Sequence, residues 1–283
     1  MPRFLKKRKN SAGLTPGTLV HIGERLMEKP KISIIDYSPS ELEEKTIDNI
    51  EECSVYQEKP TITWINIDGI HQANIIEQIG RSFRIHPLTL EDIMNTTQRP
   101  KIDYFPGYIF IALKMFYWDE AEQEIAIEHI SLILTGHTVI SFQEREGDVF
   151  NSVRERIKKK TSKIRKSGAD YLVYALLDSI VDQYFLILEK LGDKTELLED
   201  ALIKQPSPEN LRVVHQGQRE VGERSVLVRH ERDHRRHARL LRLRQPDPEV
   251  EAERLRELVG EERPERLAGD AAHELAHGPA EGD

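Results

Sequence analysis

Three apolar runs lie close together between residues 108 and 143: YIFIALKMFY at 108–117, EHISLIL at 128–134 and TVISFQ at 138–143. β-Branched and aromatic residues dominate them, and the turn signal Thr135-Gly136-His137 separates the last two. Strands joined by short polar links form hairpins. Because runs this apolar are buried on both faces, we expect helices to cover the sheet on two sides. The stretch therefore predicts an α/β protein, a three-layer α/β/α sandwich with a mixed central sheet.

Upstream of this stretch the chain alternates between strand and helix signals. Three β-branched runs predict strands, at Thr18–Ile22, Lys31–Ile35 and Thr61–Ile67. Three helices are expected: one that opens with the capping-box-like Ser40-Glu41-Leu42-Glu43, one over His71–Phe83, and a short one from Pro87. Ile75, Ile76, Ile79 and Phe83 share one face of the second helix.

After Val149 the apolar period becomes helical. Ala169–Ile203 contains no proline and one glycine, and its leucines recur at helical spacing. A helix of this length exceeds the usual globular range and is typical of a stalk or a coiled assembly. We therefore divide the chain into a disordered basic N-terminus at 1–14, an α/β/α domain at 15–165, a truncated stalk helix at 166–210 and a tail at 211–283.

The composition of the tail differs sharply from the rest. From Leu211 onward there is no Lys, no Ile and no Phe, Trp or Tyr, although all are common before it. A true domain boundary rarely removes three residue classes at once. The pattern favours a foreign origin for 211–283, through a shifted reading frame or an added tail.

Charge and composition exclude several classes of protein. The 38% hydrophobic content suffices for a buried core, while the net charge of −8 argues against a nucleic-acid partner, which needs a positive surface. A single cysteine, Cys53, rules out an internal disulfide and fits a reducing compartment. No apolar stretch follows the basic start, so no signal peptide is expected. The apolar run Tyr184–Leu188 is too short for a bilayer, so we expect no membrane span in the chain as given.

Several separate segments resemble the CorA family of divalent-cation channels. They are Thr63–His71, Ile85–Ile93, Gln98–Lys101, Leu113–Phe116 and Ala169–Leu172, in the family's order and spacing over about residues 14–205. The resemblance implies a homopentamer in which a cytosolic α/β/α domain leads into a long helix that lines the pore. A second transmembrane helix would follow, with a Gly-Met-Asn signature between the two. The chain departs from that pattern, since neither Gly-Met-Asn nor the two membrane helices occur in it.

The resemblance also implies a regulatory metal site and a location. In the family, Mg²⁺ bound between neighbouring cytosolic domains holds the pore closed, and the matching positions here are Glu91, Asp92 and Asp178. The family's remaining acidic ligand would fall in the tail, where it cannot be located. Hard carboxylate oxygens suit Mg²⁺, and Co²⁺ or Ni²⁺ should be able to replace it. The full-length protein is expected in the cell membrane, with this portion in the cytoplasm, no small-molecule substrate and no enzymatic activity.

Other interpretations of these residues stay open. Glu91 and Asp92 could simply favour the dipole of a helix start, and Asp178 with Asp182 could be a solvated helix face. The domain could also serve a soluble metal-binding or scaffolding protein without a channel. A zinc peptidase is a remote alternative, because His273-Glu274-Leu275-Ala276-His277 has the spacing of two zinc ligands and a general base. Gly278-Pro279 follows that motif at once, with no scaffold to supply a third ligand.

Overall fold

The computed structural model describes residues 15–119 and 124–204. Its strands are β1 Lys31–Tyr37, β2 Leu42–Ile47, β3 Ile62–Asp68, β4 Lys101–Phe105, β5 Tyr108–Asp119, β6 Glu124–Thr135 and β7 Thr138–Gln143. Its α-helices are α1 Ala73–Ser82, α2 Pro87–Met94, α3 Asn151–Lys158 and α4 Ala169–Lys204, and its 3₁₀ helices are η3 Ile50–Glu58 and η4 Lys163–Lys166. The expectations for residues 1–14 and 211–283 lie outside the described residues.

All seven strands form one mixed sheet, in the order β2-β1-β3-β7-β6-β5-β4. Every neighbouring pair is antiparallel except β3 and β7, which run parallel in the centre of the sheet. The β5–β6 hairpin pairs eleven residues of each strand, from Ile109 opposite Leu134 to Asp119 opposite Glu124. The three apolar runs between residues 108 and 143 form β5, β6 and β7, as predicted.

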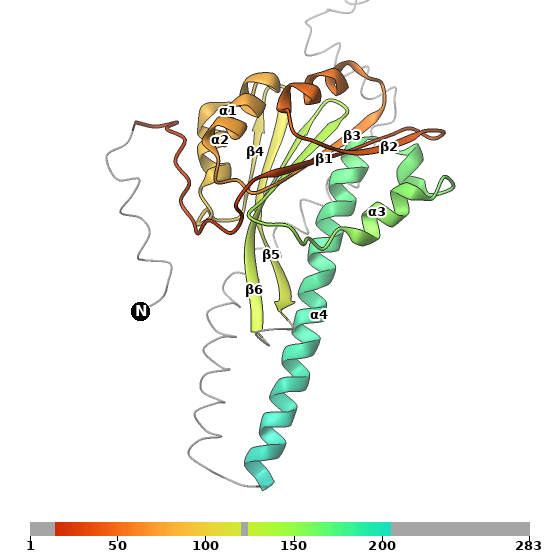
Figure 1. Ribbon diagram of the computed structural model, residues 1–283. Coiled ribbons are helices and arrows are strands. Elements are labelled where there is room, and N and C mark those ends of the chain that lie inside the picture. Colours follow the sequence, from red (N-terminus) through yellow and green to blue (C-terminus); the bar gives the residue numbers. More distant parts are fainter. Residues whose placement is uncertain (1–14, 120–123, 205–283) are drawn as a thin grey trace, which may run out of the picture. The chain divides into compact units, whose positions relative to one another are not determined.

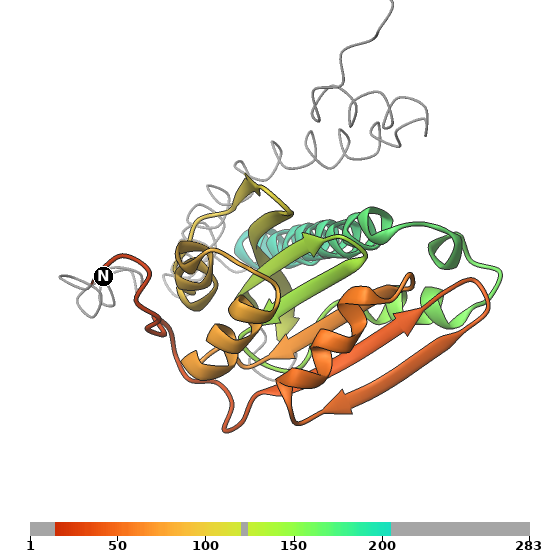
Figure 2. The same ribbon diagram turned by 90° about the horizontal axis from the view of Figure 1, so that it is seen from above.

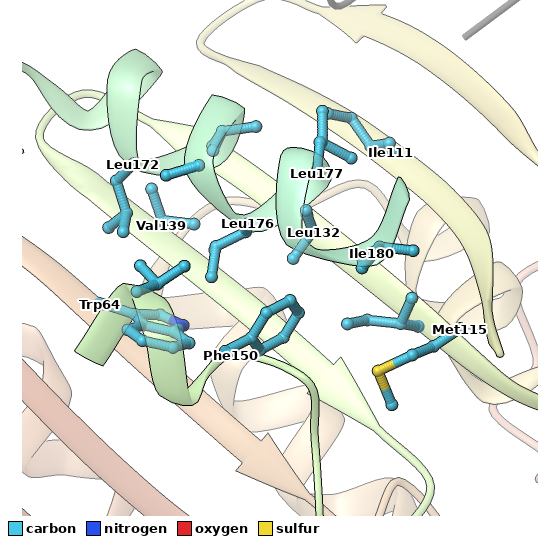
Figure 3. Packing of buried hydrophobic residues seen from close by; sticks show 14 of the residues in the cluster. Trp64, Ile111, Met115, Leu132, Val139, Phe150, Leu172, Leu176, Leu177 and Ile180 are labelled. Carbon is cyan, nitrogen blue, oxygen red and sulfur yellow. The ribbon is translucent and has the colours of Figure 1, made fainter. Parts of the chain in front are cut away.

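Helices cover both faces of the sheet, so the predicted three-layer α/β/α arrangement is confirmed (Figures 1 and 2). Alternate side chains of the central strands enter two separate cores, as the pleat requires. On one face Ile65 and Ile67 pack with α1, α2 and η3. On the other face Trp64 joins Phe150 and the buried side of α4 (Figure 3).

The packing of Trp64 shows how the second core is closed. The Trp64 indole N–H donates to Ser141 Oγ at 2.9 Å, so its one polar atom is satisfied although only 1% of the residue is exposed. Phe150 meets the indole edge-on with ring centroids 5.7 Å apart, and the Arg154 guanidinium lies 4.9 Å from the ring centre. Trp64 is therefore a core residue.

Two element predictions are wrong, and three elements were missed. Thr18–Ile22 is not a strand, because only Ile22 makes a β-bridge, to Asn95. The segment after Ser40 is not a helix but the edge strand β2, because it pairs along its whole length with the apolar strand β1. The missed elements are β4, η3 and η4. They are rich in charged residues, so none shows a clear hydrophobic period.

The first part of α4 packs in the core and its C-terminal part runs past the sheet (Figure 1). By length and composition alone Ala169–Leu197 could cross a membrane, and it is the one such helix among the described residues. Its buried positions, among them Leu172, Leu176 and Ile180, pack against the sheet. The core therefore accounts for much of the apolar content of this helix.

Candidate metal site

Helix α2 places two acids at the surface because the residues around them on its other face are buried in the core. Pro87 occupies the first turn, where its missing N–H costs nothing, and His86 Nδ1 accepts from the Leu88 N–H at 3.2 Å. Leu90, Ile93 and Met94 are buried in the core shared with α1. The intervening Glu91 and Asp92 are left partly exposed.

The carboxylate of Glu91 holds an upstream segment of the chain. Its Oε2 atom accepts from the Gly17 N–H at 2.8 Å. The same segment is fixed again at Ile22, whose N–H donates to the Met94 carbonyl at 3.0 Å and whose carbonyl accepts from the Thr96 N–H at 3.0 Å. Residues 15–22 thus run along α2, although they form no strand. No local pattern predicts this contact, because it joins residues far apart in the chain.

The carboxylate of Asp92 holds cationic and amide donors. Lys101 Nζ lies 2.6 Å from Asp92 Oδ2 and 2.8 Å from Asp103 Oδ2, and the Gln98 amide donates to Asp92 Oδ1. Burial alone would lower the pKa of the Lys101 ammonium, but its hydrogen bonds to Asp103 and Asp92 outweigh burial and raise that pKa. Lys101 therefore carries its positive charge at neutral pH. Gln98 and Lys101 belong to one of the segments that resemble the family, but their contact with Asp92 could not be predicted from the sequence.

Asp178 lies on the opposite side of the sheet from these two acids. It is a partly exposed residue of α4 and accepts from the Tyr174 hydroxyl, one turn earlier, at 3.0 Å. The core residues of α4 and those of α2 belong to different clusters, separated by the sheet. A single chain therefore does not bring Asp178 to Glu91 and Asp92. Within residues 15–119 and 124–204, no group of three or more His, Cys, Asp or Glu side chains could hold a metal ion.

The donor chemistry of α2 fits a magnesium ion that keeps most of its water. Mg²⁺ prefers oxygen ligands at 2.0–2.1 Å and is commonly held by one or two carboxylates. Glu91 and Asp92 are adjacent, partly exposed and carry only oxygen donors. A complete site would need further ligands from outside this chain. The alternative zinc motif at His273, Glu274 and His277 lies outside the described residues.

Comparison with solved structures identifies the class of the fold. The soluble domain of CorA from Methanocaldococcus jannaschii matches with a TM-score of 0.50 at 18% identity, over 66% of this chain and 70% of that one. The full-length CmaX protein matches with a TM-score of 0.56 at 15% identity, over 71% of this chain and 61% of that one. The fold is therefore that of the soluble domain of CorA proteins.

Comparison with known sequences identifies the family. The CorA-like Mg²⁺ transporter protein family matches residues 59–264. The cobalt/magnesium transport protein CorA of Thermotoga maritima is 44% identical over 218 residues, which are 77% of this chain and 62% of that protein. A putative metal ion transporter of Bacillus subtilis is 28% identical over 51% of this chain and 44% of that protein.

The chain belongs to the CorA-like Mg²⁺ transporter family. It spans less than two thirds of the length of these two relatives. The family consists of ion transporters, in agreement with the expectation that the chain is not an enzyme.

Proposed function

We propose that this chain is the cytosolic regulatory domain of a magnesium and cobalt channel, and that Mg²⁺ binds between neighbouring copies of it to close the pore. The full protein would lie in the cell membrane as a homopentamer, anchored by membrane-spanning helices. Co²⁺ or Ni²⁺ would be able to occupy the same oxygens. The 44% identity with a cobalt/magnesium transport protein supports the transported ions.

One observation carries the placement of the metal between copies. Glu91 and Asp92 lie on one side of the sheet and Asp178 lies on the other. If all three bind one ion, they must come from different chains. Two copies placed side by side can set the α2 face of one against the α4 face of the next. The pattern repeats head to tail, and such an interface forms a ring when the rotation between copies closes.

Electrostatics then give the switch its direction. Without metal, the carboxylates on the α2 face of one copy and on the α4 face of the next repel one another and favour separation of the two copies. A divalent ion between them reverses the sign of the interaction. Binding shifts an equilibrium between closed and open arrangements by the difference in affinity for the two. Because Mg²⁺ would keep several waters and few protein ligands, its affinity would be modest, as a sensor of millimolar magnesium requires.

Mg²⁺ titration of the purified chain tests the proposal. We expect Mg²⁺ and Co²⁺ to release or absorb heat in calorimetry and to promote self-association in sedimentation velocity. Asp92→Asn and Asp178→Asn should each weaken both responses. Asp182→Asn, one turn beyond Asp178 on the exposed side of α4, is the matched control and should respond like the parent. If Asp92→Asn also responds like the parent, the assignment of the site is wrong.

A further inference from the structure

We propose that Lys101 is a built-in competitor for the metal, whose ammonium occupies the Asp92 carboxylate in the metal-free chain and moves to Asp103 when a divalent ion binds. This inference rests on the proposed function, because it concerns how the same site is regulated. It makes Lys101 a residue that sets the metal concentration at which the site responds.

The geometry puts a cation on the oxygen that a metal would need. Lys101 Nζ is 2.6 Å from Asp92 Oδ2, within the range of a strong charge-assisted hydrogen bond. An Mg²⁺ ion would sit 2.0–2.1 Å from the same oxygen, and an ammonium and a divalent ion cannot both approach it that closely without strong repulsion. The other oxygen, Oδ1, already accepts from the Gln98 amide. The ammonium on Oδ2 therefore opposes a divalent ion at Asp92, whereas the neutral amide on Oδ1 leaves that oxygen a second lone pair.

The Lys101 ammonium can leave Asp92 because a second carboxylate lies beside it. Its Nζ atom is also 2.8 Å from Asp103 Oδ2, so the ammonium can keep an anionic partner after releasing Asp92. The main chain need not move, since Lys101 is fixed at the start of β4 opposite Ala112 of β5. Its Nζ also lies 5.5 Å from the centre of the Phe110 ring, which can hold the cation near this place. Only the end of one side chain has to shift.

Competition of this kind lowers the apparent affinity of the site. A ligand that binds only when the competing contact is open is weakened by the fraction of molecules in which it is open. The pair is partly exposed, with 32% of the Lys101 side chain and 22% of the Asp92 side chain accessible. Solvent screening keeps such a pair modest, so we expect a factor of about five rather than several orders of magnitude.

Calorimetric titration of Lys101 variants with Mg²⁺ tests the inference. Lys101→Met should tighten Mg²⁺ binding about fivefold, because it removes the ammonium and keeps the length of the side chain. Lys101→Arg keeps the charge and should bind no more tightly than the parent. Asp103→Asn should weaken binding in the parent background, since Lys101 loses its alternative partner. In the Lys101→Met background the same change should have a smaller effect.

Asp92→Asn separates this inference from the proposed function. If Lys101→Met and Lys101→Gln, both folded by circular dichroism, bind Mg²⁺ like the parent while Asp92→Asn is impaired, the metal site stands and the competition is disproved. If Asp92→Asn itself binds like the parent, the proposed site fails and the competition fails with it. Equal tightening by Lys101→Met with and without Asp92→Asn would show a general effect of charge and would also overturn the inference.

Discussion

The guanidinium of Arg165 donates a hydrogen bond of 2.7 Å to the main-chain carbonyl of Glu41. The two residues are far apart in sequence, Arg165 in η4 and Glu41 in the turn between β1 and β2. The same guanidinium donates to the carbonyls of Ser38 at 2.7 Å and Ile157 at 3.1 Å. With only 2% of its surface exposed, Arg165 joins the edge of the sheet to the segment that leads into α4.

Replacing Arg165 should destabilise the domain strongly. Arg165→Met removes three hydrogen bonds in a buried place, although the Glu41 carbonyl still accepts from the Ser38 N–H. We therefore expect the free energy of unfolding to fall by about 2–4 kcal/mol. Arg165→Lys should also be destabilising, because an ammonium cannot reproduce the planar fork of donors. Urea unfolding monitored by tryptophan fluorescence measures the change. The neighbouring and exposed Lys166→Met is the control, and a loss for Arg165→Met no larger than its own would contradict this role.

The burial of Arg165 could not be predicted from the sequence. This residue belongs to a strongly basic stretch, for which a solvated surface is the usual expectation, yet its side chain is buried. Local pattern identified β5, β6, β7, α1, α2 and α4, because their apolar periods are long or continuous. It failed at β2, where Ser40-Glu41-Leu42-Glu43 has the composition of a helix start. There, pairing with β1 outweighs local preference.

The candidate site, too, could be predicted from the sequence only in part. Glu91, Asp92 and Asp178 could be identified only through ordered motifs that resemble a family, because acids at a helix start or on a helix face are common. Their internal partners could not be predicted. Gly17 reaches Glu91 across 74 positions of sequence, and Lys101 reaches Asp92 only because β4 packs beside α2. Such contacts depend on tertiary packing, which produces no hydrophobic periodicity in the sequence.

Glu128 should make stability fall as the pH rises from about 5 to 8. Burial raises the pKa of this carboxyl from 4.5 to about 8, and only 2% of the residue is exposed. Between these values the folded state holds a proton that the unfolded state has lost, so the free energy of unfolding falls as pH rises. One proton gives a slope of at most about 1.4 kcal/mol per pH unit.

Glu128→Gln should flatten this slope. The amide oxygen can still accept from the main-chain N–H groups of Glu144 and Arg145, which contact Glu128 Oε1 in the parent. The comparison is clearest between pH 6 and 8, because burial also raises the pKa of Asp68, to about 6. Urea midpoints measured at intervals from pH 5 to 9 give the slopes. The exposed Glu155→Gln should retain the parental slope, and a Glu128→Gln profile parallel to the parent would exclude Glu128 as its source.

Lys114 should act in the opposite direction at higher pH. Burial lowers the pKa of its ammonium from 10.5 to about 8. Between pH 8 and 10.5 the unfolded state binds a proton that the folded state has released, so this group makes the free energy of unfolding rise with pH. Lys114→Met should remove that rise, whatever it does to stability at neutral pH. Denaturant unfolding at pH 8, 9 and 10 measures the effect, and an unchanged pH dependence would contradict it.

Contact between the α2 face of one copy and the α4 face of another should be detectable by cross-linking. Leu88 is 47% exposed on α2, one turn before the candidate acids, and Asp182 is exposed on α4, one turn after Asp178. Cysteines at these positions leave all three candidate ligands in place. The only native cysteine, Cys53, is fully buried and its thiol pKa is raised to about 12 by burial, so it should stay unreactive.

A mixture of Leu88→Cys and Asp182→Cys chains should therefore form covalent heterodimers with a short bifunctional maleimide, and Mg²⁺ should increase their yield. A chain that carries both substitutions should link to other copies and not to itself, because the sheet separates the two positions. Val55→Cys is the matched control for Asp182→Cys. It is 63% exposed on η3, on the same side of the sheet as α2, so its mixture with Leu88→Cys should show no increase with Mg²⁺. Equal Mg²⁺-independent yields from both mixtures would mean that the two faces meet only by random collision. That result would contradict a metal site between the α2 face of one copy and the α4 face of another.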